Sequence, residues 1–307
     1  MKINLKIILS AAMLLTCVVG CTRTLPDRVS TGDVEGISVV ADTFTADAAV
    51  GPSNGVELPE PTGFATITGT ITVKGNIDRD KFQAYKATKD LNVCSTDPNP
   101  RVVTNGDGAL QWGLLYYDGP FKAGDTKWEH ADYLATATRE LNGDLAFDQK
   151  ECIFLSRIYA MRTGQVLEIK NSDPVGHNAK MDGLTSANMQ IGTGSSVTYT
   201  PLFQESKPFG VSCSAHEWMS SYIIVRDSPF FAVSGEDGTF QIANLPSGIP
   251  LSFKFWHEVL PGGSYAITIN GETETLKRGK LELPELAPDE QRVLNIEIDA
   301  GLFNDAL

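Results

Sequence analysis

Short segments that alternate apolar and polar residues recur along this 307-residue chain from residue 65 onward, and they limit it to folds made of strands. Residues 65–73 have the sequence Ala-Thr-Ile-Thr-Gly-Thr-Ile-Thr-Val, whose β-branched side chains and period of two indicate a half-buried strand. Turn pairs such as Asn105-Gly106 and Asn270-Gly271 separate several further strand candidates. These candidates are residues 110–117, 157–161, 166–170, 196–200, 209–212, 222–226, 230–234, 239–242, 251–256, 265–269 and 293–298. We therefore predict an all-β chain built from β-sandwiches.

Two stretches lack this alternation. Residues 80–91 could hold a short helix, and residues 126–138 could hold a second helix or an irregular loop.

The start of the chain is typical of an export signal. Lys2 and Lys6 precede a largely apolar run of 13 residues, 7–19, which is too short for a membrane span and fits a signal-peptide core. The sequence Val18-Val19-Gly20-Cys21 resembles the lipobox of bacterial lipoproteins, which implies cleavage before Cys21 and a diacylglycerol on its thiol. A plain signal peptide with an incidental cysteine is the alternative.

The residues that follow predict how the folded part is held. Thr22, rather than Asp, follows Cys21, and by resemblance to known sorting signals this favours the periplasmic side of the outer membrane if the host has two membranes. Residues 21–62 are rich in Thr, Ser, Asp, Ala, Gly and Pro and predict a flexible tether. We expect an exported protein, lipid-anchored to the bacterial cell envelope, with no other contact with the membrane.

The charge of the chain excludes one class of partner. The net charge is −13, and removal of residues 1–20 takes away two lysines and no acidic residue, which leaves −15. Binding of nucleic acid needs clustered Lys and Arg, so we expect none. A negative surface would instead steer a basic redox partner, such as a cytochrome or a dehydrogenase, although acidity can also serve solubility alone.

Four residues form a candidate metal site. Cys213, His216 and Met219 share one short segment between two predicted strands, and His177 lies 36 residues before Cys213, just after another predicted strand. Two imidazoles and a thiolate with a weak axial Met are the ligands of a blue-copper site. The pattern predicts one copper ion of type 1. A zinc site and a disulfide through Cys213 are the alternatives.

The two ligand segments resemble those of the cupredoxin family, and the compact Cys-x2-His-x2-Met loop is most similar to the amicyanin type. The resemblance covers about residues 140–228 and implies a Greek-key sandwich. It implies that Asn178 braces the ligand loop and that its backbone helps to hold the Cys213 sulfur. It also implies that His216 reaches the surface in an apolar patch, with Trp218 and Met219 nearby. The alternative for Trp218 is that it simply packs over the site or in the core.

The same resemblance implies one-electron transfer rather than enzymatic catalysis. A metal closed by four protein ligands has no open position for a substrate. The chain has no carboxylate in the place of Met219, no second cysteine near Cys213 and no His-x-His pair among its four histidines. These are the marks of other copper centres, so we expect no catalytic residues.

The number of cysteines gives partly independent support. Cys17 lies in the segment to be removed and Cys21 would carry lipid, which leaves Cys94, Cys152 and Cys213. An exported chain with three cysteines is expected to pair two of them. Because Cys213 is surrounded by ligands, we predict a disulfide between Cys94 and Cys152.

The C-terminal part resembles a carboxypeptidase-regulatory-like domain, a small transthyretin-type β-sandwich. The resemblance covers residues 229–298 and rests on residues 237–248, which match Asp-Gly-x-Phe-x-Ile-x-x-Leu-Pro-x-Gly. Related sandwiches are suspected sugar-binding modules, which implies a cell-surface glycan as a second partner.

We therefore predict five parts: a signal peptide (1–20), a tether (21–62), an N-terminal β segment (63–139), a cupredoxin domain (140–228) and the regulatory-like domain (229–307). The segment 63–139 could complete the C-terminal sandwich or enlarge the cupredoxin, and we slightly favour the former. Chains of this tandem type resemble those labelled methylamine-utilisation-like.

Other functions stay open at this point. A surface-anchored module that binds sugar or protein, with a structural metal site, is the main alternative to electron transfer. A copper carrier would need exposed tracts rich in Met and His, and a copper enzyme would need an open position on the metal. We expect His257 to cap a strand or pack beside the first domain, His130 to lie at the surface, and Glu217 to be a solvated loop residue.

Overall fold

The computed structural model describes residues 58–82, 87–94 and 100–306. Leu58–Leu307 forms one compact unit. The predicted signal peptide, Cys21 and nearly all of the predicted tether lie outside the described residues. Among the residues that are described, none of the helices has the length and apolar character needed to cross a membrane.

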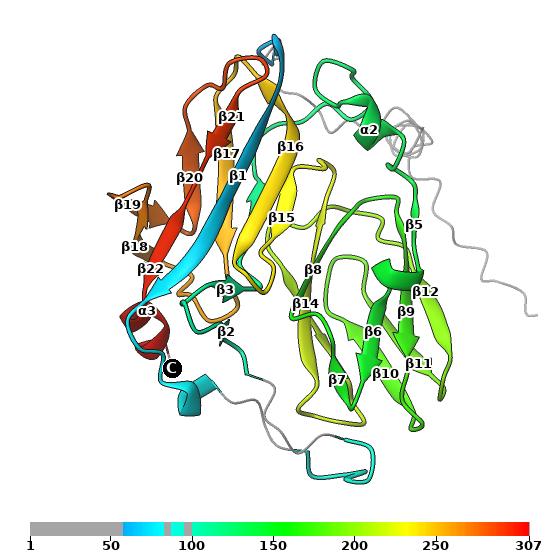
Figure 1. Cartoon of the computed structure of the whole chain (residues 1–307). Coiled ribbons are helices and arrows are strands. Elements are labelled where there is room, and N and C mark those ends of the chain that lie inside the picture. Colours follow the sequence, from blue (N-terminus) through cyan, green and yellow to red (C-terminus); the bar gives the residue numbers. More distant parts are fainter. Residues whose placement is uncertain (1–57, 83–86, 95–99, 307) are drawn as a thin grey trace, which may run out of the picture. The chain divides into compact units, whose positions relative to one another are not determined.

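The chain is all-β, as predicted, and its largest sheet combines strands from both ends of the described chain (Figure 1). The long strand β1 (Gly63–Lys74) runs antiparallel to β16 (Thr239–Ser247) and parallel to β21 (Gln291–Val293) and β22 (Ile296–Asp299). The order continues from β22 through β18, β19, β20, β17 and β4 to β15. Their bounds are Ser264–Ile269 (β18), Glu272–Lys277 (β19), Lys280–Leu283 (β20), Leu251–Trp256 (β17), Leu114–Tyr117 (β4) and Phe231–Val233 (β15).

This sheet curls towards closure. Strands β15 and β16 stand at the two ends of its order, yet they are consecutive in the chain, joined by residues 234–238. The curled sheet encloses the larger hydrophobic core, whose fully buried members include Ile67, Tyr117, Phe253 and Phe303. Phe303 belongs to the short helix α3 (Ala300–Asn304), which follows β22 and lies at one end of this core.

Besides the large sheet, two smaller sheets pack against each other as a sandwich. This second sandwich holds the ligand segments. One has the order β11-β10-β13-β14-β8 and the other the order β12-β9-β6-β7, with β5 added beside β9. The first comprises Ala187–Ile191 (β11), His177–Met181 (β10), Phe209–Ser212 (β13), Ser220–Arg226 (β14) and Ile158–Arg162 (β8). The second comprises Ser196–Tyr199 (β12), Val166–Asn171 (β9), Phe147–Lys150 (β6), Ile153–Phe154 (β7) and Glu140–Leu141 (β5). Apolar side chains from both sheets pack into one core, which includes Phe147, Leu167, Met181 and Ile223.

A third, small apolar cluster joins the large sheet to the second sandwich. Leu114 and Tyr116 of β4 pack with Ile158 of β8 and Ile224 of β14, and all four side chains are buried. Strands β1 and β4 of the predicted segment 63–139 thus lie in one sheet with β15–β22, and β4 also contacts the second sandwich. The domain boundaries at residues 139 and 228 stay a prediction.

The expected strands are present with small changes of bounds, but two expectations need correction. The stretch 293–298 is divided between β21 and β22, with Leu294 and Asn295 between them. The stretch 110–117 is not one strand: it forms β3 (Leu110–Gln111), which pairs with β2 (Val103–Thr104), and β4, separated at Trp112 and Gly113. Trp112 has a φ of +70°. A side chain at position 113 would lie 2.8 Å from Ile71 Cδ1, so glycine lets the chain pass close to β1.

The two stretches in which a helix was possible contain little helix. Within 80–91, only the end of the 3-10 turn Arg79–Phe82 is helical among the described residues, and residues 87–91 are not helical. Within 126–138, one turn of helix, α2 (Ala131–Leu134), is present. A further 3-10 turn, Gly143–Leu145, precedes β6.

Candidate metal centre

Three of the predicted ligands lie on one tight loop between β13 and β14. The two strands are antiparallel, and Ser212 pairs with Ser220 at their ends, so residues 213–219 form the connection. The backbone N–H of Cys213 donates to the Met219 carbonyl (3.3 Å), and the backbone N–H of Met219 donates to the His216 carbonyl (2.9 Å). These bonds fold the loop back on itself and keep all three residues at one end of the sandwich.

The remaining predicted ligand, His177, is the first residue of β10, the strand beside β13. Its Nδ1 atom lies 3.0 Å from Nδ1 of His216, and Cys213 Sγ lies 3.9 Å from each of these two nitrogen atoms. All three side chains are buried. The structure therefore brings two imidazoles and one thiol to a common point.

The spacing of these three atoms fits a single metal ion. Metal–nitrogen bonds of about 2.0 Å and a metal–sulfur bond of about 2.3 Å allow ligand atoms up to about 4 Å apart. The two nitrogen atoms and the sulfur atom all lie within that limit. Two imidazoles with one thiolate is also the equatorial donor set of a blue-copper site.

The contacts of the second ring nitrogen, Nε2, of each histidine also favour a metal ion between the two Nδ1 atoms. Nε2 of His177 lies 2.8 Å from Asp173 Oδ2, and Nε2 of His216 lies 2.9 Å from Asp90 Oδ2. An ionised carboxylate only accepts hydrogen bonds, so this network assigns a proton to both Nε2 atoms. In the neutral rings the Nδ1 lone pairs then face each other at 3.0 Å, which is favourable only with a cation or a proton between them.

Asp173 connects His177 to a strained turn. Its carboxylate accepts the backbone N–H groups of Glu151 (2.7 Å) and Cys152 (2.8 Å), which form the two-residue turn between β6 and β7. Both turn residues have positive φ, +55° and +57°, a conformation that neither side chain favours. The carboxylate thus stabilises the turn and orients His177 at the same time. Sequence reasoning assigned no role to Asp173, although a carboxylate four residues before a ligand histidine is a usable signal.

The position of His216 corrects the expectation drawn from the family. Its side chain is 1% exposed and does not reach the surface. Asp90 lies against the ring edge that was expected to face solvent. The sequence gives no signal for this contact, because Asp90 lies 126 residues before His216.

The surroundings favour a thiolate at Cys213. Burial alone would raise the pKa of this thiol, but hydrogen bonds with His177, with the backbone N–H of Asn178 and with His216 outweigh burial and lower its pKa to about 6. Burial would likewise lower the pKa of His177, but its contacts with Cys213 and Asp173 raise that pKa above the ordinary value. A thiolate is the form that binds metal.

Asn178 contacts the ligand loop in two ways. Its backbone N–H donates to Cys213 Sγ (3.5 Å), and its side-chain carbonyl accepts the backbone N–H of Ser214 (2.7 Å). The side-chain amide also donates to Asn188 of β11 (2.7 Å). Asn178 therefore links the cysteine loop to two neighbouring strands.

The other residues of the loop divide between the core and solvent. The Met219 side chain is buried in the same apolar cluster as Cys213. Trp218 belongs to this cluster as well, and its ring centroid lies 5.1 Å from that of His216. Its indole N–H donates to the Cys152 carbonyl (3.0 Å). Glu217 is exposed between two of the predicted ligands.

The structure joins Cys94 and Cys152 in a disulfide, as the number of cysteines predicts, and Cys213 is the free thiol among the described cysteines. Both disulfide sulfur atoms lie within 4.8 Å of a ring nitrogen of His216. The disulfide is therefore part of the wall of the site.

Comparison with solved structures finds copper proteins. A Cu(I) form of an amicyanin variant is similar over 26% of this chain and 80% of its own, with 14% identity and a TM-score of 0.24. A copper-containing nitrite reductase from Thermus scotoductus SA-01 is similar over 26% of this chain and 22% of its own, with 18% identity and a TM-score of 0.25. No family model and no curated protein matches the chain.

The two remaining histidines lie away from this centre. The side chain of His130 is 34% exposed and caps helix α2, where its Nδ1 accepts the backbone N–H of Asp132. His257 is buried against Phe303 of α3, and its Nδ1 accepts the backbone N–H of Val259 (3.3 Å). Neither residue belongs to a group of potential metal ligands among the described residues.

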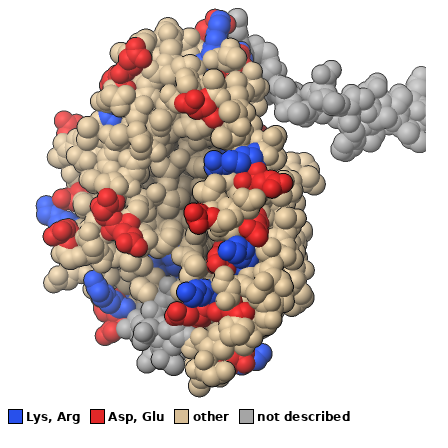
Figure 2. Space-filling view, turned by 45° about the vertical axis from the view of Figure 1, so that its right-hand side comes forward, with Lys and Arg blue, Asp and Glu red and all other residues tan. Residues whose placement is uncertain are grey.

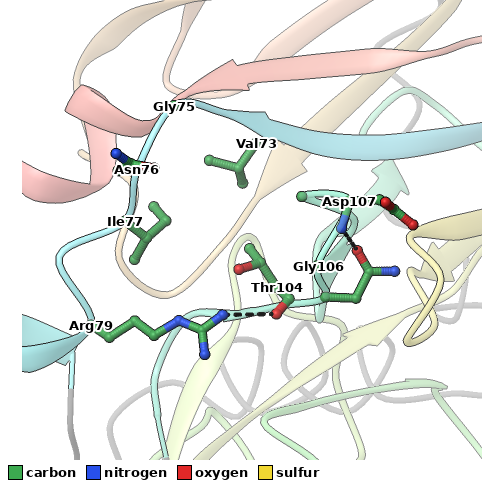
Figure 3. Close-up of a pocket in the computed structure, with 10 residues that line it drawn as sticks. Val73, Gly75, Asn76, Ile77, Arg79, Thr104, Gly106 and Asp107 are labelled. Carbon is green, nitrogen blue, oxygen red and sulfur yellow. Dashed lines mark hydrogen bonds between the residues drawn. The ribbon is translucent and has the colours of Figure 1, made fainter.

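A pocket of about 360 Å³ lies beside the C-terminal end of β1 rather than at the metal centre (Figure 3). Its polar groups bond to one another. Arg79 donates to the Thr104 carbonyl (3.4 Å), and Asn105 Oδ1 accepts the backbone N–H groups of Asp107 and Ala109. The polar groups of this pocket therefore hold its loops together, and they do not point to a ligand.

Proposed function

We propose that this chain is an exported, membrane-anchored type 1 blue-copper protein that transfers single electrons and is not an enzyme. The observation that carries the proposal is the pair of facing Nδ1 atoms, 3.0 Å apart and each 3.9 Å from Cys213 Sγ, whose Nε2 atoms are both held by carboxylates. This arrangement leaves three donor atoms that converge on one point.

The residues would divide the work as follows. His177, Cys213 and His216 would hold a copper ion, and Met219 would supply the weak axial sulfur. Bound there, copper would supply reversible one-electron chemistry. The hydrogen bonds of Asp173, Asp90 and Asn178 fix the rings and the loop before the metal binds, so that little rearrangement would accompany a change of oxidation state.

Visible absorption and EPR spectra of the full chain, purified in mild detergent and loaded with Cu(II), test this function. We expect an intense thiolate-to-copper band and narrow hyperfine splitting, both lost in Cys213→Ser and both kept in the neighbouring control Ser214→Ala. A colourless protein, or an ordinary tetragonal copper signal, would contradict the proposal. The surface-anchored binding module with a structural metal would then be the better account.

The anchor and the partner are separate parts of the proposal. The sequence around Cys21 supports a lipid anchor, and Cys21→Ser should move the protein from the membrane fraction to the soluble fraction after cell lysis. The charge of −15 after cleavage supports a basic redox partner, whose electron-transfer rate should fall with added salt. On the face in Figure 2, acidic and basic side chains are interspersed, so no single-sign patch on that face marks the docking site. A rate that does not change with salt would argue against steering.

A further inference from the structure

A short segment outside the second sandwich closes the edge of the metal centre. The His216 side chain is 1% exposed, whereas the Asp90 side chain that pairs with its Nε2 is 32% exposed. Asp90 therefore stands between the ligand imidazole and solvent, at the point where the ring would otherwise meet water.

The backbone around Asp90 is built to hold this carboxylate. The Asp90 carbonyl accepts the backbone N–H groups of Val93 (2.8 Å) and Cys94 (2.9 Å), which form a tight turn. Asp90 itself has a φ of +52°, a left-handed conformation that Asp and Asn tolerate better than most residues. The turn ends at Cys94, and the disulfide to Cys152 ties it to the sandwich.

The disulfide also connects Asp90 to the other carboxylate of the site. The Cys152 backbone N–H donates to Asp173, which holds His177. A chain of contacts therefore runs from one ligand imidazole to the other through Asp173, the Glu151–Cys152 turn, the disulfide and Asp90. This chain of contacts positions the two rings together, through the ring edges that face away from the metal.

We propose that Asp90 is a positioning residue of the metal centre, which the Cys94–Cys152 disulfide holds in place, and that it lowers the reduction potential of the bound metal. This inference rests on the proposed copper function. An acceptor on Nε2 fixes the ring with its Nδ1 lone pair towards the metal and makes that nitrogen a stronger donor. A negative charge at this place also favours the more positive oxidation state of the metal.

The decisive comparison is between Asp90→Asn and Glu217→Gln in the copper-loaded full chain. Both variants remove one negative charge near the centre, but Glu217 is exposed and has no hydrogen bond to a ligand ring among those described. Asparagine also tolerates the left-handed backbone at position 90. Loss of a carboxylate partner of a ligand histidine weakens metal binding about tenfold or more.

If the substitution weakens the binding of Cu(II) but not that of Cu(I), a tenfold loss of Cu(II) affinity corresponds to a rise in reduction potential of about 59 mV for a one-electron couple. We expect this rise in Asp90→Asn, which removes the charge but keeps an oxygen that can accept from His216 Nε2. We expect a larger rise in Asp90→Gly, which removes both the charge and this acceptor, and a clearly smaller rise in Glu217→Gln. Equal potentials in Asp90→Asn and Glu217→Gln would overturn the proposal, because the effect would then be one of charge at a distance.

The role of the disulfide is tested by a double-mutant cycle. In a Cys94→Ser/Cys152→Ser background the segment is no longer tied, so adding Asp90→Asn should cause little further change in potential. A full additional shift would overturn the part assigned to the disulfide. If this background fails to fold, as judged by circular dichroism, the single variants still decide the role of Asp90.

Failure of this inference can be separated from failure of the copper function. If the wild-type chain shows no blue-copper spectrum, the function fails, and the affinity for Zn(II) measured against a chelator becomes the readout. Asp90→Asn should weaken Zn(II) binding about tenfold relative to Glu217→Gln. Equal Zn(II) affinities would overturn the positioning role as well.

Discussion

Glu258 and Arg157 form a bidentate ion pair in which both side chains are almost completely buried. Arg157 Nε lies 2.7 Å from Glu258 Oε1, and its terminal nitrogen lies 2.6 Å from Oε2. Arg101 adds a second cation, with its Nε 3.0 Å from Oε2. Glu258 follows β17 of the large sheet, whereas Arg157 precedes β8 of the second sandwich, so this pair joins the two.

Substitution of Glu258 should therefore be costly. Glu258→Gln would leave Arg157 buried without its counter-ion, and we expect the free energy of unfolding to fall by about 3–5 kcal/mol. Urea unfolding monitored by circular dichroism measures this change. The control Glu282→Gln removes one carboxylate of an exposed pair with Lys280 and should change stability by less than about 0.5 kcal/mol. Equal effects of the two substitutions would refute the importance of the buried pair.

His257 should make stability depend on pH. Burial lowers its pKa from 6.5 to about 4, against the opposing effect of Glu258 and with a contribution from Arg157 and Arg101. Above pH 6.5 the ring is neutral in both states. Below that value the unfolded chain binds a proton that the folded chain does not bind until about pH 4, so folding loses about 2 kcal/mol by pH 5.

The measurement is urea unfolding at pH 8 and pH 5 for the wild type, His257→Gln and His130→Gln. The His257→Gln variant should lose about 2 kcal/mol less than the wild type between these pH values. The partly exposed His130 provides the comparison substitution at a second histidine. The same pH dependence in all three proteins would contradict the pKa shift.

Asp173 should be sensitive to even a near-isosteric change. Three N–H groups converge on its carboxylate, from Glu151, Cys152 and His177. In Asp173→Asn one of them would meet an amide donor, so we expect a loss of about 2 kcal/mol in stability and at least tenfold weaker metal binding. The exposed Asp182, which pairs with Lys180, provides the control Asp182→Asn. Metal affinity equal to that of this control would rule out the bracing role of Asp173.

Met219→Leu should keep the colour of the copper protein and change its potential. The thiolate that gives the intense band remains, but the weak axial sulfur that tunes the potential is lost. We expect a higher reduction potential, measured by redox titration, with the thiolate band retained. Met189→Leu in β11 is the matched control and should leave the potential unchanged. An unchanged potential in Met219→Leu would show that this sulfur is not a ligand.

The sequence predicted those parts of the fold that depend on local patterns. Alternation of apolar and polar residues marks β1 and β9 well, and the bounds of β13 and β17 agree fully with the expected ranges. The strand that carries His177 was missed, because His-Asn-Ala-Lys-Met has no clear alternation and gains its partners only from β11 and β13.

The site was predictable to a similar degree. Cys213, His216 and Met219 lie within one loop, so their spacing reveals them, and His177 follows from the metal chemistry that they imply. Asp90 could not be predicted, since its contact with His216 depends on the disulfide and on a turn far away in the chain. The burial of His216 was missed for the same reason.

The position of β1 has a consequence for the order in which the protein folds. Its partners are residues 239–247 and 291–299, so β1 can complete its pairing only after the rest of the chain is available. Strands β5–β14, by contrast, find their partners within residues 140–226. Because pairing over long sequence separations is slow, we expect the sandwich with the metal ligands to gain structure first. The unpaired backbone edges of β1 then stay exposed to other chains during the slowest step. We therefore expect this Thr- and Ile-rich strand to be the part most prone to aggregation.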